Sequence, residues 1–185
     1  MKKLENGSLT VLPYILIMAA AFLRLAVDHP YNFVPLFSCI LFFGANRPGR
    51  EFPIPLLALM GVDVFLTTQH YGYAISGDHA FTWAWCMVVM MLGAGMLAAK
   101  ITTPRILGAS LSASVGFFDM SNFAVWSVWG MYPKTGVGLV TCYIAAIPFF
   151  SNSLAVETVC SLLLFTAARY LGTLPSATTM QNRFS

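Results

Sequence analysis

Long apolar stretches separated by short polar segments make up most of this chain. A helix that crosses ~30 Å of hydrocarbon needs roughly 20 mostly apolar residues, with about 17 to 25 tolerated. The pattern predicts transmembrane helices over residues 9–27, 33–45, 53–68, 81–99, 106–129 and 154–170. The second of these is short and ends at the polar run NRPGRE. We therefore expect an all-α membrane protein that forms a bundle of six transmembrane helices.

The last apolar stretch, residues 137–171, is too long for one transmembrane helix and too short for two helices of full length with a connection between them. Pro148 has no amide donor, and a proline disfavours helix in the residue before it. The run SNS at 151–153 is then typical of a new helix start, with Asn152 or Ser153 as the N-cap. The sequence predicts a short helix over 137–147 within the last outer loop, followed by the sixth span.

The basic residues are divided unequally between the two sides of this topology. With the N-terminus inside, the outer side holds only Arg24 and Lys134. A seven-span alternative would place Arg169 and Arg183 outside and weaken this bias, which is the usual positive-inside pattern. We therefore expect six spans with both termini in the cytoplasm. The basic residues predicted to be cytoplasmic are Lys2, Lys3, Arg47, Arg50, Lys100, Arg105, Arg169 and Arg183.

Composition agrees with a membrane protein. Hydrophobic residues are 58% of the 185 residues and charged residues only 9%, whereas a soluble domain carries about 25% charged residues. The net charge of +3 is too small to suggest a nucleic-acid partner. The first apolar run has no small-residue cleavage site after it, so we interpret it as a permanent span rather than a signal peptide. Residues 1–185 are expected to form a single integral membrane domain.

Side chains able to bind a ligand gather on the predicted outer side. All three histidines, His29, His70 and His79, lie in predicted outer loops. An aromatic belt at the membrane interface would explain the tyrosines and tryptophans equally well, but it does not explain the histidines. The pattern favours a binding face that is open to the exterior. The aromatic residues on that side are Tyr31, Tyr71, Tyr73, Trp83 and Tyr132.

Cys86 is the strongest single candidate for a metal-binding or reactive side chain. The four cysteines form no CxxC pair, so neither a structural zinc site nor a redox dithiol is indicated. Cys86 lies about one turn into the fourth predicted span, beside Trp83 and Trp85 and close to His79. A thiolate binds soft and transition metals well, although a cysteine in a membrane span is usually a small apolar filler.

Four polar residues lie inside predicted spans, where they are costly: Asp63, Asp119, Asn122 and Glu157. Such groups mark a pathway or an interhelical contact. The membrane-enzyme motifs HExxH, GxSxG and paired GxGD are missing, and no Walker motif or nucleotide fingerprint is present, so no nucleotide cofactor is predicted. Arg24 is expected either to snorkel to the interface or to pair with Asp28, one helical turn later.

Two blocks carry a resemblance to a known family. LRLAVDHPYNFVPLFSCILFFGA and NFAVWSVWGMYPKTGVGLVTCYIAAIPFFSNSLAVE resemble the S-components of energy-coupling-factor (ECF) vitamin transporters, across about residues 23–170. Those are six-helix, substrate-binding subunits of the bacterial inner membrane whose outer loops close over a vitamin. The cysteine at the start of the fourth helix is similar to that of the solitary, cobalamin-specific, BtuM-like members. The resemblance therefore implies binding and uptake of cobalamin (vitamin B12).

The resemblance assigns a role to Cys86, namely to ligate the cobalt of cobalamin with its thiolate. A thiolate could also weaken the bond to a cyanide on the opposite face, so loss of cyanide is the one chemical step implied for an otherwise non-enzymatic transporter. The remaining residues are predicted to contact the vitamin from their location alone. The ring is expected to be covered by Tyr71, Tyr73, Trp83 and Trp85. The amide side arms are expected to meet His29, Asn32, His79 and Tyr132, and Tyr31 is a further contact residue.

One departure from the family concerns its shared energising module. S-components that dock on this module typically carry an AxxxA pattern in the first helix, whereas MAAAFLRLA has three consecutive alanines and no pair four apart. This favours a solitary protein over one that works with an ECF module. Two alternatives stay open: the same fold with another vitamin, a corrinoid or haem as ligand, and an intramembrane enzyme that uses Asp63, Asp119 and Glu157.

Overall fold

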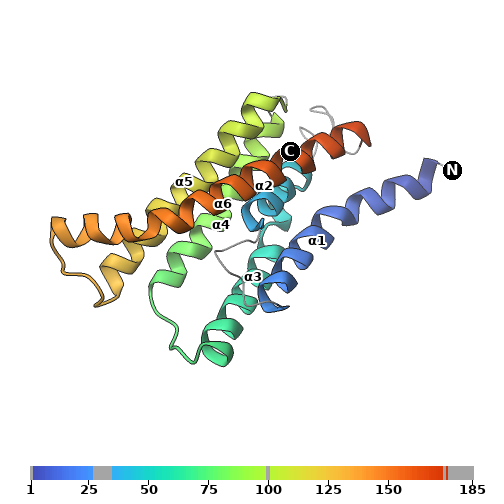
Figure 1. Ribbon diagram of the computed structural model, residues 1–185. Coiled ribbons are helices and arrows are strands. Elements are labelled where there is room, and N and C mark those ends of the chain that lie inside the picture. Colours follow the sequence, from blue (N-terminus) through green and yellow to red (C-terminus); the bar gives the residue numbers. More distant parts are fainter. Residues whose placement is uncertain (1, 27–34, 99–100, 173, 175–185) are drawn as a thin grey trace.

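The computed structural model describes residues 2–26, 35–98, 101–172 and 174, and this part of the chain is helical (Figure 1). Short connections join the helices, and Figure 1 shows the connection between the last two projecting away from the rest of the bundle. In chain order the elements are α1 (Lys2–Ala26), α2 (Leu36–Asn46), the 3-10 turn η1 (Gly49–Glu51), α3 (Pro53–Phe65), the π-helical turn η2 (Leu66–His70), α4 (Asp78–Ala98), α5 (Thr103–Val128) and α6 (Gly136–Tyr170).

Five of the predicted helices are confirmed to within a few residues, apart from α1, which begins earlier than expected. Three helical stretches are long and apolar enough to cross a membrane, namely Gly49–His70, Asp78–Met96 and Gly136–Tyr170. The apolar helices Val11–Leu25 and Leu36–Asn46 are shorter. The described part of the chain thus forms a helical bundle, and the protein has the composition of a membrane protein.

The predicted break at Pro148 is wrong. Residues 136–170 form one helix, α6, with Pro148 inside it, so the short loop helix and the separate span at 154–170 do not exist as such. Ser153 does not cap a new helix, because its hydroxyl donates to Phe149 O at 3.2 Å, one turn back. Ser151 donates likewise to Pro148 O at 3.1 Å. Membrane helices tolerate an internal proline, and the two serine hydroxyls bond to carbonyls at and directly after Pro148 rather than to the carbonyl one turn before it.

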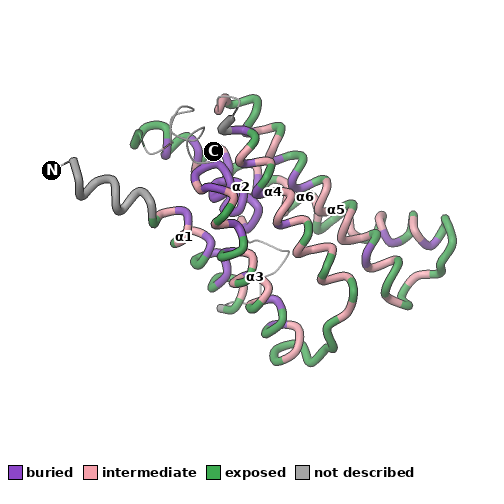
Figure 2. Tube along the Cα trace, turned by 180° about the vertical axis from the view of Figure 1, so that it is seen from behind, coloured by how far each residue is buried: buried purple, intermediate pink, exposed green. Residues whose placement is uncertain are grey.

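The core of the bundle is the short helix α2. All eleven of its residues are buried, and Figure 2 shows it as the most continuously buried segment. It packs mainly on α4, and also on α1, α5 and α6. At 1.5 Å per residue α2 is about 16 Å long, roughly half the thickness of a hydrocarbon core. One of its ends must therefore lie inside the bundle.

Two glycines allow α2 and α4 to touch through their backbones. A Cβ atom on Gly44 would lie 2.0 Å from Met90 O, and one on Gly93 would lie 2.2 Å from Leu41 O. Backbone atoms cannot move aside as the end of a flexible side chain can. Small residues at such crossings let helices approach closely enough for van der Waals packing to hold them together in a membrane.

The buried N-terminus of α2 is capped by a carboxylate from α6. Glu157 is 4% exposed, and its Oε1 accepts from Phe37 N at 2.9 Å while its Oε2 accepts from Ser38 N at 2.6 Å. The Ser38 hydroxyl lies 2.5 Å from Oε2 and accepts from the Ser161 hydroxyl at 3.1 Å. The first N–H groups of a helix have no partner within it and carry partial positive charge. A carboxylate supplies both the acceptor and the opposite charge.

Candidate functional site

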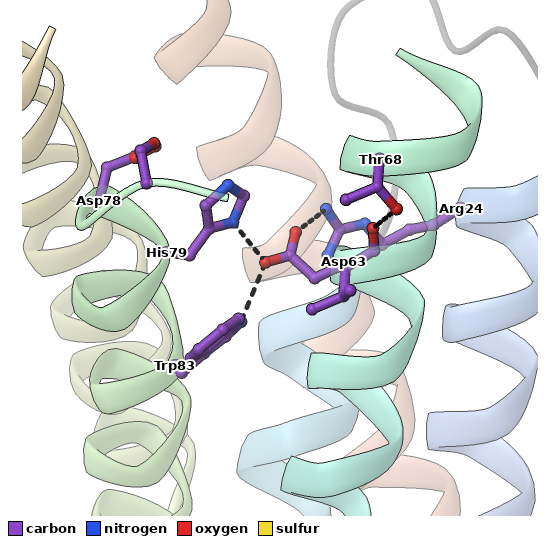
Figure 3. A network of polar contacts seen from close by, with 8 residues as sticks. Arg24, Asp63, Thr68, Asp78, His79 and Trp83 are labelled. Atoms are coloured by element: carbon purple, nitrogen blue, oxygen red, sulfur yellow. Dashed lines mark hydrogen bonds and ion pairs between the residues drawn. The ribbon is translucent and has the colours of Figure 1, made fainter. Parts of the chain in front are cut away.

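One face of α4 carries three of the residues that the sequence singled out. His79, Trp83 and Cys86 are spaced four and three residues apart, so they lie on one side of the helix. His79 Nδ1 lies 2.7 Å from Asp63 Oδ2, and Trp83 Nε1 donates to the same oxygen at 2.9 Å. Figure 3 shows both side chains of α4 directed at this carboxylate on α3. Asp63 is thus the centre of a polar network between α3 and α4.

Arg24 of α1 completes this network. Its guanidinium lies 3.7 Å from Asp63 Oδ1 (Figure 3). The sequence offered snorkelling or Asp28 as alternatives; Asp28 lies outside the described residues, and the pairing with Asp63 links helices that the sequence did not place together. A charged side chain within a membrane bundle is stabilised when it faces a partner of opposite charge. The network therefore ties α1, α3 and α4 together.

Cys86 lies in the bundle core and does not face lipid. It is 3% exposed and belongs to the main hydrophobic core. The two described cavities, of about 340 and 200 Å³, are lined mainly by α5 and α6, and Cys86 lines neither. A bulky ligand can reach this sulfur only after α4 separates from its neighbours. Packing of α4 is extensive against α2 and slight against α3.

Other predicted contact residues are dispersed. Trp85 points to the other side of α4, where its Nε1 donates to Ala113 O of α5 at 2.9 Å. Tyr71 and Tyr73, in the connection between α3 and α4, are 60% and 58% exposed. Tyr132 is half-buried and lies in the connection that joins α5 to α6. The remaining predicted residues, His29, Tyr31 and Asn32, lie outside the described residues.

The acidic residues proposed for an intramembrane enzyme occupy three different settings. Asp63 binds side chains of α4, and Glu157 binds the start of α2. Asp119 is exposed on α5. Its backbone oxygen accepts a hydrogen bond from the Tyr143 hydroxyl at 2.9 Å. Within the described part of the chain, no three His, Cys, Asp or Glu side chains converge as in a protein-only metal site. The arrangement favours single carboxylates with structural partners over a shared catalytic centre.

Comparison with known proteins places the chain in a family. Residues 4–178 match the profile of a family of unknown function, DUF6580. The chain belongs to DUF6580. No curated protein and no solved structure matches it. In this DUF6580 protein the network around Asp63 joins α1, α3 and α4, and Cys86 lies on the same face of α4 as its members His79 and Trp83.

Replacing Asp63 by asparagine tests whether this network supports the DUF6580 fold. The amide oxygen is uncharged, so its hydrogen bonds with His79 and Trp83 are weaker than those of the carboxylate, and the attraction to Arg24 is lost. We expect a loss of about 1–3 kcal/mol in the free energy of unfolding, measured as a lower melting temperature in detergent followed by tryptophan fluorescence. Asp119→Asn is the matched control because Asp119 is exposed. Equal melting of the two variants would contradict the network.

Proposed function

We propose that this DUF6580 protein binds cobalamin and carries it across the bacterial inner membrane, with Cys86 as the ligand of cobalt. The observation that supports the proposal is the position of Cys86, which is buried on the same face of α4 as His79 and Trp83, the two residues that contact Asp63. Cobalt in a corrin ring needs only an axial ligand from the protein, and one thiolate is a strong donor for that position. The resemblance to the S-components gives the ligand class.

The proposed topology places this face near the exterior. We infer six crossings with both termini in the cytoplasm, because eight basic residues then lie inside. The connection between α3 and α4 is then external, and Cys86 lies about two turns below it on α4. The resemblance to solitary members favours a protein that acts without an ECF energising module.

Binding of cobalamin requires the bundle to open at α4. The thiol is buried and neither described cavity reaches it, so the vitamin must part α4 from α3 and α1. The slight packing between α3 and α4 makes this the side with least contact to lose. The network around Asp63 would break in the same movement, which exposes His79 and Trp83 to the vitamin's side arms. The proposal includes loss of cyanide: the cobalt–cyanide bond breaks with both electrons leaving on cyanide, so the oxidation state of cobalt does not change while the Cys86 thiolate stays bound.

The test is a spectrum of cyanocobalamin titrated with the purified protein in detergent. We expect a shift of the cobalamin absorption bands and a stoichiometry of one, since exchange of an axial ligand changes the electronic state of cobalt. Cys86→Ala should abolish the shift, while Cys39→Ala, which changes another buried core cysteine, should keep it. Free cyanide in the filtrate measures the second step.

Each outcome bears on the alternatives. A shift that persists in Cys86→Ala would contradict the thiolate ligand. Binding of haem or another corrinoid in place of cobalamin would keep the carrier and change its substrate. An absence of any coloured complex with the wild-type protein would contradict the proposal outright.

A further inference from the structure

A second polar region lies where α5, α6 and the start of α2 meet. These helices line a cavity of about 200 Å³. Five phenylalanines are among the eleven residues of its wall, with Ser114, Asn122 and Glu157 among the polar ones. The larger, wholly apolar cavity of about 340 Å³ shares Phe118 with it and extends along α6 towards Leu139. The two cavities are therefore neighbours between α5 and α6.

Ser114 supplies an unused hydrogen-bonding group in the wall of this cavity. It is 4% exposed, and its hydroxyl has no partner among the described residues. A buried hydroxyl without a partner costs free energy, so such groups in folded proteins need an explanation. A ligand in the cavity would provide the missing partner.

Glu157 determines the charge that such a ligand should carry. Its carboxylate is buried, and donors from the start of α2, the backbone of Leu36 among them, approach both of its oxygens. The carboxylate therefore acts on a ligand through its charge and not through a free acceptor position. No lysine or arginine is among the residues that line the cavity. An anion would face this negative charge without compensation, whereas a cation would be attracted to it.

The phenylalanines favour the same kind of ligand. Phe37 and Phe117 pack with ring centroids 4.7 Å apart, and Phe118 and Phe150 with centroids 4.5 Å apart. Aromatic faces attract organic cations, and the attraction is strongest where water is excluded. A dry cavity of about 150 Å³ can hold one benzene molecule. A volume of about 200 Å³ therefore fits one ring with a short side chain.

We propose that the cavity between α5 and α6 is a binding site for a small organic cation that carries a single aromatic ring. The ring lies among the phenylalanines, the cationic nitrogen faces Glu157, and a donor or acceptor on the ligand meets the Ser114 hydroxyl. This site is separate from Cys86, and neither its existence nor its test depends on cobalamin.

The test uses 4-fluorobenzylammonium as probe and follows its ¹⁹F NMR signal while the intact protein is titrated in detergent. We expect saturable binding to the wild-type protein. Ser114→Ala should weaken the affinity roughly fivefold by removing one hydrogen bond. Ser110→Ala should bind as the wild type does, because Ser110 is also buried and without a partner but does not line the cavity. Partition of the probe into micelles is the same for both variants.

A second pair of variants fills the cavity from its other wall. Ala146 of α6 lines the cavity and its neighbour Ala145 is exposed and does not, so Ala146→Leu should abolish binding and Ala145→Leu should leave it unchanged. The uncharged 4-fluorobenzyl alcohol should bind at least roughly tenfold more weakly than the ammonium, and 4-fluorobenzoate should not bind. Equal affinity for alcohol and ammonium, equal behaviour of Ser114→Ala and Ser110→Ala, or no saturable binding to the wild type would each overturn the proposal.

Discussion

Gly93→Ala is expected to destabilise the protein by about 3 kcal/mol or more, because the new Cβ atom would lie 2.2 Å from Leu41 O and 2.8 Å from Ala45 N. Both are backbone atoms of α2, so only a separation of α4 from α2 can relieve the overlap. Overpacking in a well-packed core costs about 1–3 kcal/mol and occasionally more. The loss would extend to every helix that α2 contacts, since α2 is wholly buried. The measurement is the melting temperature in detergent, with size-exclusion chromatography to follow aggregation.

Gly95→Ala is the matched control for this experiment. It changes the same residue type two positions along the same helix, where a Cβ atom would meet nothing within 4 Å. Alanine has the higher helix propensity, so this variant should melt at or above the temperature of the wild type. If Gly93→Ala and Gly95→Ala had the same melting temperature, the close crossing of α2 and α4 would be wrong.

Glu157→Gln is expected to lower the free energy of unfolding by about 2–4 kcal/mol through the loss of the cap on α2. The carboxylate receives the N–H groups of Phe37 and Ser38 on its two oxygens. An amide keeps one of these oxygens and replaces the other by an NH₂ group, which is itself a donor. One buried N–H of α2 would then lack an acceptor. Chemical or thermal unfolding in detergent measures the loss.

Two further variants separate the cap from a general effect of charge. Glu157→Ala should be at least as unstable as Glu157→Gln, because both oxygens are lost. Asp119→Asn removes a carboxylate from an exposed position of α5 and should leave the stability nearly unchanged. A Glu157→Gln protein as stable as the wild type would mean that water or another group can serve as the acceptor.

The helices could be predicted from the sequence better than the contacts between them. Hydrophobic runs and their polar interruptions marked five helices to within a few residues, except at the start of α1. The prediction failed at Pro148, because the rules for helix ends come largely from proteins in water, where an unpaired carbonyl can be solvated. In α6 the hydroxyls of Ser151 and Ser153 bond back to the helix around this proline.

The candidate site could be predicted only in part, because its contacts join residues that are far apart in the sequence. The spacing of His79, Trp83 and Cys86 indicates a shared face on α4, and the structure has it. Their partner Asp63 was recognised as a costly buried acid but not as their acceptor, since 16 to 20 residues and a change of helix lie between them. Trp85 was grouped with Trp83 by proximity in sequence, although side chains two residues apart on a helix point to different sides. Cobalamin binding stays a prediction.

The cap on α2 also constrains how the chain is made. The ribosome synthesises α2 well before α6, because Glu157, which accepts the N–H of Ser38, follows it by 119 positions in the sequence. Until that later segment emerges, the first amides of α2 have no acceptor from Glu157, and a helix of this length cannot hold itself across a bilayer. The cap on α2, and the stability that it supplies, can therefore form only after α6 has been synthesised.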